Sequence, residues 1–180
     1  TSLPSYSPPC PRVTPCLLTN LQNVEPSRKW LVHCCSLVGN PDILIAALRG
    51  GNLKIAADGS HKDNHATAAV LLHADDANYL EVRLQTPGEN VDLQSHRAEV
   101  SGHYSVVTVL EVLEQMMGGN PAGSAEVICD NDASLLVFDL SYVFDPVQKD
   151  YDLASSLQRR VCRLPFRILP TWIRGHQDSK

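Results

Sequence analysis

The order of hydrophobic patterns in the middle of the chain is the feature that most constrains its fold. Three short strand-like runs, at residues 53–58, 66–73 and 79–85, are separated by short polar turns, which is typical of antiparallel hairpins. Residues 96–117 then repeat apolar side chains at close to the 3.6-residue period of a helix, and a Gly-Gly-Asn-Pro sequence ends this stretch. An apolar run at residues 125–129 follows. This order predicts an α/β domain.

The rest of the chain adds two helices and one strand to this pattern. We expect a helix to begin near Asn131, a second amphipathic helix over residues 150–161, and a last strand over residues 166–173. Strands that are connected through one helix are usually parallel neighbours in a sheet. The prediction is therefore a mixed five-stranded sheet, with three antiparallel strands followed by two parallel strands, flanked by helices.

The N-terminal region has a different composition. Residues 1–28 are rich in Pro and Ser and are predicted to form a linker or flexible arm. The domain is assigned to residues 29–180, with its core at 52–178. Residues 30–33 are predicted as a short strand, and residues 41–48 as a short helix with an Asn at its N-cap and a Pro at its first position.

The composition limits the classes of function. With 43% hydrophobic and 19% charged residues, the 180-residue chain is typical of a folded globular domain. No apolar run approaches the roughly 20 residues of a membrane-spanning helix, and the N-terminus has no signal-peptide pattern. We therefore expect no membrane partner, an intracellular location in the cytoplasm or nucleus, and six reduced cysteines.

The net charge of −5 argues against a general nucleic-acid binder, but the charges are unevenly distributed. Residues 158–180 contain one acid, Asp178, and six basic residues: Arg159, Arg160, Arg163, Arg167, Arg174 and Lys180. Such a stripe could contact phosphate groups, or it could be the solvated face of a helix. Charge alone favours neither interpretation.

Three acids stand at the ends of the predicted elements. Asp58 and Asp130 each follow an apolar strand-like run, and Glu99 lies about one turn inside the long helix. Each has an ordinary structural interpretation, as a turn former, an N-cap or a partner of the helix dipole. Together, however, they would converge at one edge of the sheet, where repelling carboxylates are stabilised by hard cations. Oxygen ligands select Mg²⁺ or Mn²⁺, and two such ions can support phosphodiester cleavage.

The ordered combination resembles the ribonuclease H fold, and more narrowly the ribonuclease H domains attached to reverse transcriptases of eukaryotic retroelements. The resemblance covers roughly residues 30–178, and no single segment is specific by itself. The segments that carry it are Ala57–Ser60, His96–Glu99, Ile128–Ala133, Asp150–Leu153 and Pro170–Asp178.

The resemblance implies a set of catalytic residues. Asp58, Glu99 and Asp130 match the acids that bind two Mg²⁺ ions in this family, with Mn²⁺ as a substitute. His176 matches a mobile histidine that assists proton transfer or product release. The family usually carries a fourth acid on a helix after this histidine, and Asp178 stands too close to His176 to match it.

The resemblance also implies a substrate and partners. Such enzymes cut the RNA strand of RNA–DNA hybrids, which they recognise through 2′-hydroxyl groups and backbone shape. Ser60, Asn131, Arg174 and Gln177 are then expected to contact the nucleic-acid backbone, and an adjoining reverse transcriptase domain is the expected partner. The alternatives are a catalytically inactive module that binds nucleic acid or protein, and another nuclease or transposase of the same fold.

Overall fold

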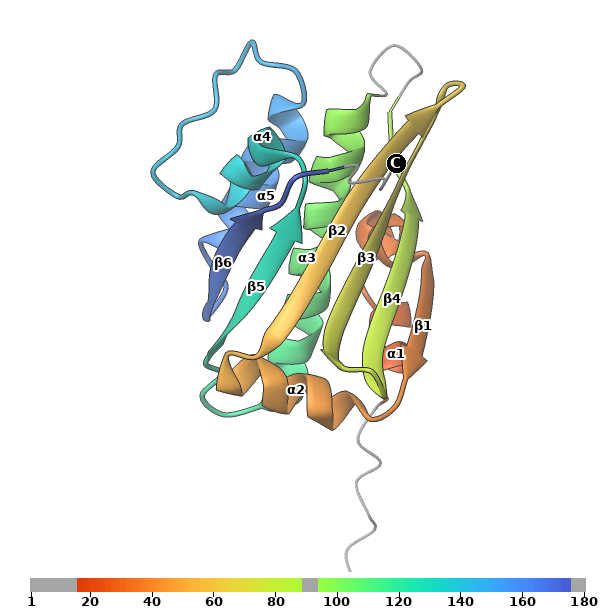
Figure 1. Ribbon diagram of the computed structural model, residues 1–180, viewed down its shortest axis with the longest axis vertical. Helices are drawn as coiled ribbons and strands as arrows, with labels where there is room; N and C mark the ends of the chain where they lie inside the picture. The colour runs from red at the N-terminus through yellow and green to blue at the C-terminus, as the bar shows by residue number, and fades with distance from the viewer. Residues whose placement is uncertain (1–15, 89–93, 176–180) are drawn as a thin grey trace, which may run out of the picture.

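The computed structural model describes residues 16–88 and 94–175, which form a mixed α/β domain around one sheet (Figure 1). The six strands lie in the order β1-β4-β3-β2-β5-β6. β2, β3, β4 and β1 pair antiparallel, whereas β5 pairs parallel with β2, and β6 pairs parallel with β5. The strands are β1 (Cys34–Val38), β2 (Leu53–Lys62), β3 (His65–Asp75), β4 (Asn78–Gln85), β5 (Gly123–Cys129) and β6 (Phe166–Trp172).

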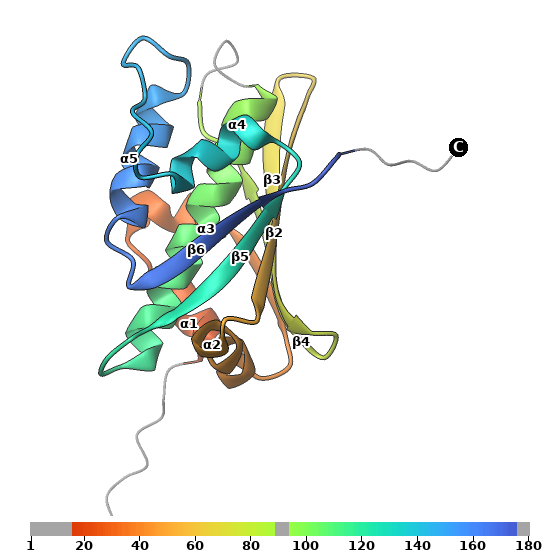
Figure 2. The ribbon, with the colours of Figure 1, turned by 60° about the vertical axis from the view of Figure 1, so that its left-hand side comes forward.

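The main helices lie on one side of the sheet (Figure 2). The long helix α3 packs against β2 and β3, and α1 and α5 pack against α3. Along β2, buried Ile55 and Ala57 alternate with exposed Ala56 and Asp58, so this strand faces the core on one side and solvent on the other. The helices are α1 (Leu17–Gln22), α2 (Pro41–Gly50), α3 (Ser95–Met117), α4 (Asp132–Leu135) and α5 (Tyr151–Val161), with 3₁₀ helices η1 (Pro26–Val32) and η2 (Leu136–Phe138).

The predicted hairpins, the long helix and the two parallel strands are confirmed, but β2 is longer than predicted. It continues to Lys62, so Asp58 lies inside the strand and not at its end. The hairpin turn is formed by Asp63 and Asn64, whose φ angles of 49° and 61° suit the tight turns that match the twist of a hairpin. The Gly-Ser-His sequence after Asp58 has little strand propensity, and pairing with β3 extends the strand through it.

The predicted elements around the first hairpin and near the C-terminus are also present. The helix predicted at 41–48 is α2, where Asn40 Oδ1 accepts a hydrogen bond from the Asp42 N–H at 2.9 Å. Gly51 ends it in the left-handed conformation, with φ at 73°. The helices predicted after residue 130 are α4 and α5, and the last strand is β6.

The sheet has six strands, which corrects the predicted five. Residues 30–33, predicted as a strand, belong mostly to η1, and the strand β1 begins after them at Cys34. β1 is an edge strand that pairs only with β4 in the described residues. Its sequence, Cys-Cys-Ser-Leu-Val, has no clear strand pattern, so its conformation comes from this pairing.

Part of the predicted N-terminal arm packs on the domain. Leu17 and Leu21 in α1 are 0% and 1% exposed and belong to the main hydrophobic core. Residues 17–28 are therefore part of the folded unit, whereas residues 1–15 lie outside the described residues. Among the residues that the structure describes, no helix is both long and apolar enough to cross a membrane.

The burial of α1 can be tested by truncating one side chain. We expect Leu17→Ala to lower the free energy of unfolding by about 2–5 kcal/mol, because it leaves a cavity in the core. The exposed Thr19 in the same helix provides the control variant Thr19→Ala. Chemical denaturation measures the free energy of unfolding of both variants. A Leu17→Ala variant as stable as Thr19→Ala would show that α1 is not part of the core.

Candidate active site

Two of the predicted site acids come from neighbouring parallel strands. β2 and β5 pair in register, with Ala56 opposite Ile128. Asp58 and Asp130 therefore each lie two residues beyond this pair, at the same edge of the sheet. The expectation that these two strands are neighbours is confirmed.

The third acid reaches this edge from the first turns of α3. Glu99 is the fifth residue of α3, which agrees with its predicted position about one turn inside the helix. Gly59 makes its approach possible, because a β-carbon at this position would overlap the backbone nitrogen of Glu99. Only glycine allows this close contact between the helix and β2. The strand residue directly after Asp58 thus sets the position of the helix residue Glu99.

Glu99 and Asp130 form a compact cluster with an unpredicted neighbour, Cys129. One potential ligand atom from each of the three lies within 4.8 Å of the others. Glu99 is 4% exposed and Cys129 is 2% exposed. The Cys129 thiol donates a hydrogen bond to Glu99 Oε2 at 3.4 Å, and its sulfur accepts one from the Asn131 N–H at 3.4 Å. Burial raises the pKa of Cys129 to about 11, so the thiol stays protonated and remains a donor at neutral pH.

The electrostatics of the cluster are unfavourable for a buried carboxylate. Burial raises the pKa of Glu99 to about 7, against hydrogen bonds from the Gly59 backbone and the Cys129 thiol that lower it. The negative charges of Asp58 and Asp130 raise it further. A cation at this position would relieve the repulsion, and the two carboxylates offer the oxygen ligands that suit Mg²⁺ or Mn²⁺. The residues present therefore fit a divalent cation.

Asp58 lies next to this cluster but outside the 4.8 Å group. It is exposed on the helix-free face of β2, although its charge still acts on Glu99. On that face it borders an open groove of about 400 Å³ that also includes the predicted contact residue Ser60. The other residues along the groove are His33, Cys34, Thr67, Ala68, Ala69, Arg83, Leu84 and Gln85. The structure therefore brings two acids together directly and the third within electrostatic range.

The end of β6 packs against the end of β5. The Ile173 N–H donates to the Cys129 carbonyl, and Trp172 Nε1–H donates to the Asp130 carbonyl, both at 3.0 Å. A β-carbon at Gly175 would overlap Asp130 Oδ2, so the backbone of this residue lies directly against the Asp130 carboxylate. His176, the next residue, and Gln177 lie outside the described residues.

The other predicted contact residues have different environments. Asn131 acts as the N-cap of the short helix α4, where its Oδ1 accepts a hydrogen bond from the Ser134 N–H at 3.1 Å. Arg174 is exposed beyond the end of β6. Asn131 therefore has a structural role whether or not it contacts a ligand, and Arg174 is the predicted residue whose charge is open to solvent.

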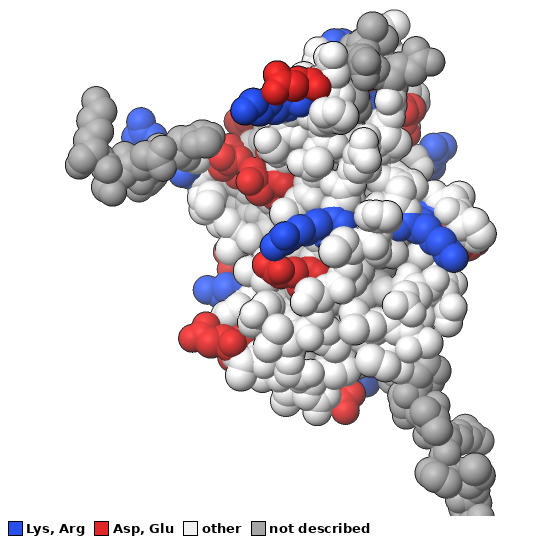
Figure 3. Space-filling view, turned by 90° about the vertical axis from the view of Figure 1, so that its right-hand side faces the viewer, with Lys and Arg blue, Asp and Glu red and all other residues white. Residues whose placement is uncertain are grey.

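The predicted basic stripe at the C-terminus is not continuous. Arg160 is buried, forms an ion pair with Glu111 and lies over the Tyr104 ring at 4.8 Å from its centroid. On the face shown in Figure 3, Lys and Arg side chains are scattered among acidic ones, a few lie across its middle, and most of the surface is uncharged. No extended basic patch forms on this face, so phosphate contacts there would depend on individual cations.

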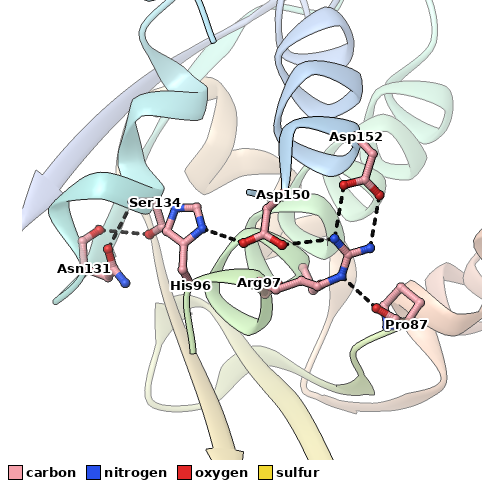
Figure 4. Close-up of polar contacts among 8 residues, drawn as sticks. Pro87, His96, Arg97, Asn131, Ser134, Asp150 and Asp152 are labelled. Atoms are coloured by element: carbon pink, nitrogen blue, oxygen red, sulfur yellow. Dashed lines mark hydrogen bonds and ion pairs between the residues drawn. The ribbon is translucent and has the colours of Figure 1, made fainter. Parts of the chain in front are cut away.

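A polar network joins the start of α3 to the start of α5 (Figure 4). Arg97 donates to Asp150 and Asp152, and His96 is hydrogen-bonded to Asp150. Burial would raise the pKa of Asp150, but its bonds to His96 and Arg97 outweigh this effect and hold the pKa below its ordinary value. No sequence pattern assigned a role to these side chains. The available signal was the His96-Arg97 pair, which is separated from Glu99 by one residue, and the Asp-Tyr-Asp sequence that begins the later helix.

Comparison with solved structures connects this architecture to a known fold. LC11-RNase H1, solved in complex with an RNA/DNA hybrid, matches with a TM-score of 0.50 and 17% identity, over 71% of this chain and 88% of that chain. The chain has the ribonuclease H-like fold. No protein family model matches the sequence, and neither does any curated protein.

Two further solved structures match with lower TM-scores. RNase H1 from the halophilic archaeon Halobacterium salinarum matches with a TM-score of 0.46 and 15% identity, over 68% of this chain and 86% of that chain. The foamy viral protease-reverse transcriptase matches with a TM-score of 0.41 and 10% identity, over 69% of this chain and 17% of that chain.

The raised pKa of Glu99 predicts a pH dependence of stability. The folded state favours the protonated acid, so the stabilisation is fully present below the ordinary pKa of 4.5 and is lost as the pH rises through about 7. Between about pH 4.5 and pH 8, with chelator present, the wild type should lose on the order of 2 kcal/mol more unfolding free energy than Glu99→Gln. Urea unfolding of the two proteins at both pH values measures this difference in unfolding free energy. Equal pH dependence in the two proteins would show that Glu99 titrates normally.

Proposed function

We propose that this protein is a metal-dependent endoribonuclease that cleaves the RNA strand of RNA–DNA hybrids. The observation that carries the proposal is the convergence of Glu99 and Asp130 at the sheet edge, with Asp58 close enough to repel Glu99. On a ribonuclease H-like fold, three acids in this order suit phosphodiester hydrolysis. A retroelement reverse transcriptase polyprotein is the proposed context, with a polymerase domain as the partner.

In this proposal Asp58, Glu99 and Asp130 hold Mg²⁺, or Mn²⁺ in its place. The bound metal would activate a water molecule and neutralise charge on the phosphate. The rest of the chain maintains the geometry of these ligands. The Cys129 thiol holds one oxygen of Glu99, and Trp172 holds the backbone of Asp130. His176 is proposed to assist proton transfer or product release.

The proposed substrate contacts surround this cluster. Ser60 lies in the groove beside Asp58, which provides a path for one strand of the hybrid across the helix-free face of the sheet. Arg174, Asn131 and Gln177 are also proposed to contact the nucleic-acid backbone. Recognition through 2′-hydroxyl groups and phosphates would make cleavage depend on RNA but little on base sequence.

A cleavage assay tests the proposal directly. With Mg²⁺, the wild type should cut the RNA strand of a labelled RNA–DNA hybrid. Because they remove proposed metal ligands, Asp58→Asn and Asp130→Asn should each reduce the rate by more than the roughly 10–100-fold typical of losing an outer-shell partner. Asp42→Asn, at an exposed acid in α2, is the matched control and should retain wild-type activity. Chelation of the metal should abolish cleavage.

Other outcomes of this assay would contradict the proposal. Cleavage that is unaffected by Asp58→Asn and Asp130→Asn would place the activity elsewhere, including in a contaminant. Binding of the hybrid without cleavage would favour the inactive binding module. Cutting of DNA junctions instead of hybrids would indicate another nuclease or a transposase.

A further inference from the structure

The first turn of α3 has no capping side chain of its own. Gln94 occupies the N-cap position without a side-chain hydrogen bond to the helix, and the first turn contains no acidic residue. Such helix ends are usually frayed unless other groups hold them. Glu99 lies only one turn farther along, so the position of its carboxylate depends on what restrains this end. The restraint comes from residues that are distant in the sequence.

Arg97 connects this turn to two other segments through three nitrogen atoms (Figure 4). Its Nη1 donates to Asp150 Oδ1 at 3.0 Å and to Asp152 Oδ1 at 3.1 Å, and its Nη2 donates to Asp152 Oδ2 at 3.1 Å. Its Nε donates to the Pro87 carbonyl at 2.9 Å. The planar guanidinium group is thereby fixed in both orientation and position. The helix turn that carries it is fixed with it.

Asp150 is the central acceptor of this network. Its side chain is 4% exposed, and both of its oxygens are used, because Oδ2 is 3.0 Å from His96 Nδ1. The residue adopts the left-handed conformation, with φ at 62°, directly before α5. Asp152, by contrast, has a side chain that is 67% exposed. Asp150 therefore supplies the buried part of the restraint, and Asp152 the solvent-exposed part.

We propose that Asp150 is a positioning residue for Glu99: by holding His96 and Arg97, it fixes the first turn of α3 and so aims the Glu99 carboxylate at Asp130. Its consequence for catalysis rests on the proposed function. The structural part does not, because it concerns only where the Glu99 carboxylate is held. Groups that orient metal ligands from outside the coordination sphere usually contribute strongly to metal affinity.

Three variants separate this role from general stability. Asp150→Asn removes the charge but keeps the shape and tolerates the left-handed backbone. Asp152→Asn removes the exposed acceptor charge and leaves the buried one. Asp145→Asn is the matched control and changes an exposed acid in the same connecting segment. Among the hydrogen bonds of the described residues, its side chain accepts only from the nearby Val147 N–H.

Two measurements are made on each folded variant, namely Mn²⁺ affinity by calorimetry and amide hydrogen exchange along α3. Asp150→Asn should weaken Mn²⁺ binding by about 10–100-fold and speed exchange at residues 98–102 but not near Met117. Asp152→Asn should produce a smaller effect of the same kind. Asp145→Asn should match the wild type in both measurements.

Wild-type Mn²⁺ affinity and exchange in folded Asp150→Asn would overturn the proposal. If Asp150→Asn does not fold, Asp152→Asn decides: faster exchange at residues 98–102 with weaker Mn²⁺ binding supports the proposal, and wild-type values overturn it. A wild-type protein that binds Mn²⁺ but cleaves no hybrid would overturn the proposed function and leave this inference standing on the two measurements. The failures of the two proposals are therefore distinguishable.

Discussion

The close contact between α3 and β2 at Gly59 is the constraint on which the site depends. No side chain larger than glycine fits there, because the backbone of Glu99 occupies the space. This contact brings an acid from a helix to the same sheet edge as Asp58 on β2 and Asp130 after β5. A second close contact involves Gly175, the last described residue, whose backbone lies against the Asp130 carboxylate. Both glycines thus bring backbone segments up to the acidic cluster.

The cluster combines burial with negative charge, which is costly in a folded protein. Donors from the Gly59 backbone and the Cys129 thiol offset part of the cost for Glu99, yet its pKa stays near 7. The network around Asp150 keeps the helix end in place despite this repulsion. A divalent cation would convert the unfavourable arrangement into a favourable one, which links metal binding to the stability of this part of the fold.

The sequence predicted the elements with strong local signals and the order of the acids. The apolar period of α3 and its Gly-Gly-Asn-Pro stop, the hairpins and the Asn40 cap are all local, and the structure confirms them. The extension of β2 past Asp58, the strand β1 and the burial of Leu17 depend on tertiary pairing and packing, which no local pattern encodes. The same holds for the bonds of Cys129 to Glu99 and of Asp150 to Arg97, which join residues 30 and 53 positions apart.

The central claim is that Glu99 and Asp130 jointly hold a divalent cation at this sheet edge. Crystals of the full chain soaked with Mn²⁺ test it through the anomalous scattering of the metal. We expect an anomalous peak in contact with the carboxylates of Glu99 and Asp130, on the side that faces Asp58, and its loss in Glu99→Gln crystals. A peak elsewhere on the protein, or none at Mn²⁺ concentrations that saturate binding in solution, would show that Glu99 and Asp130 do not hold the cation.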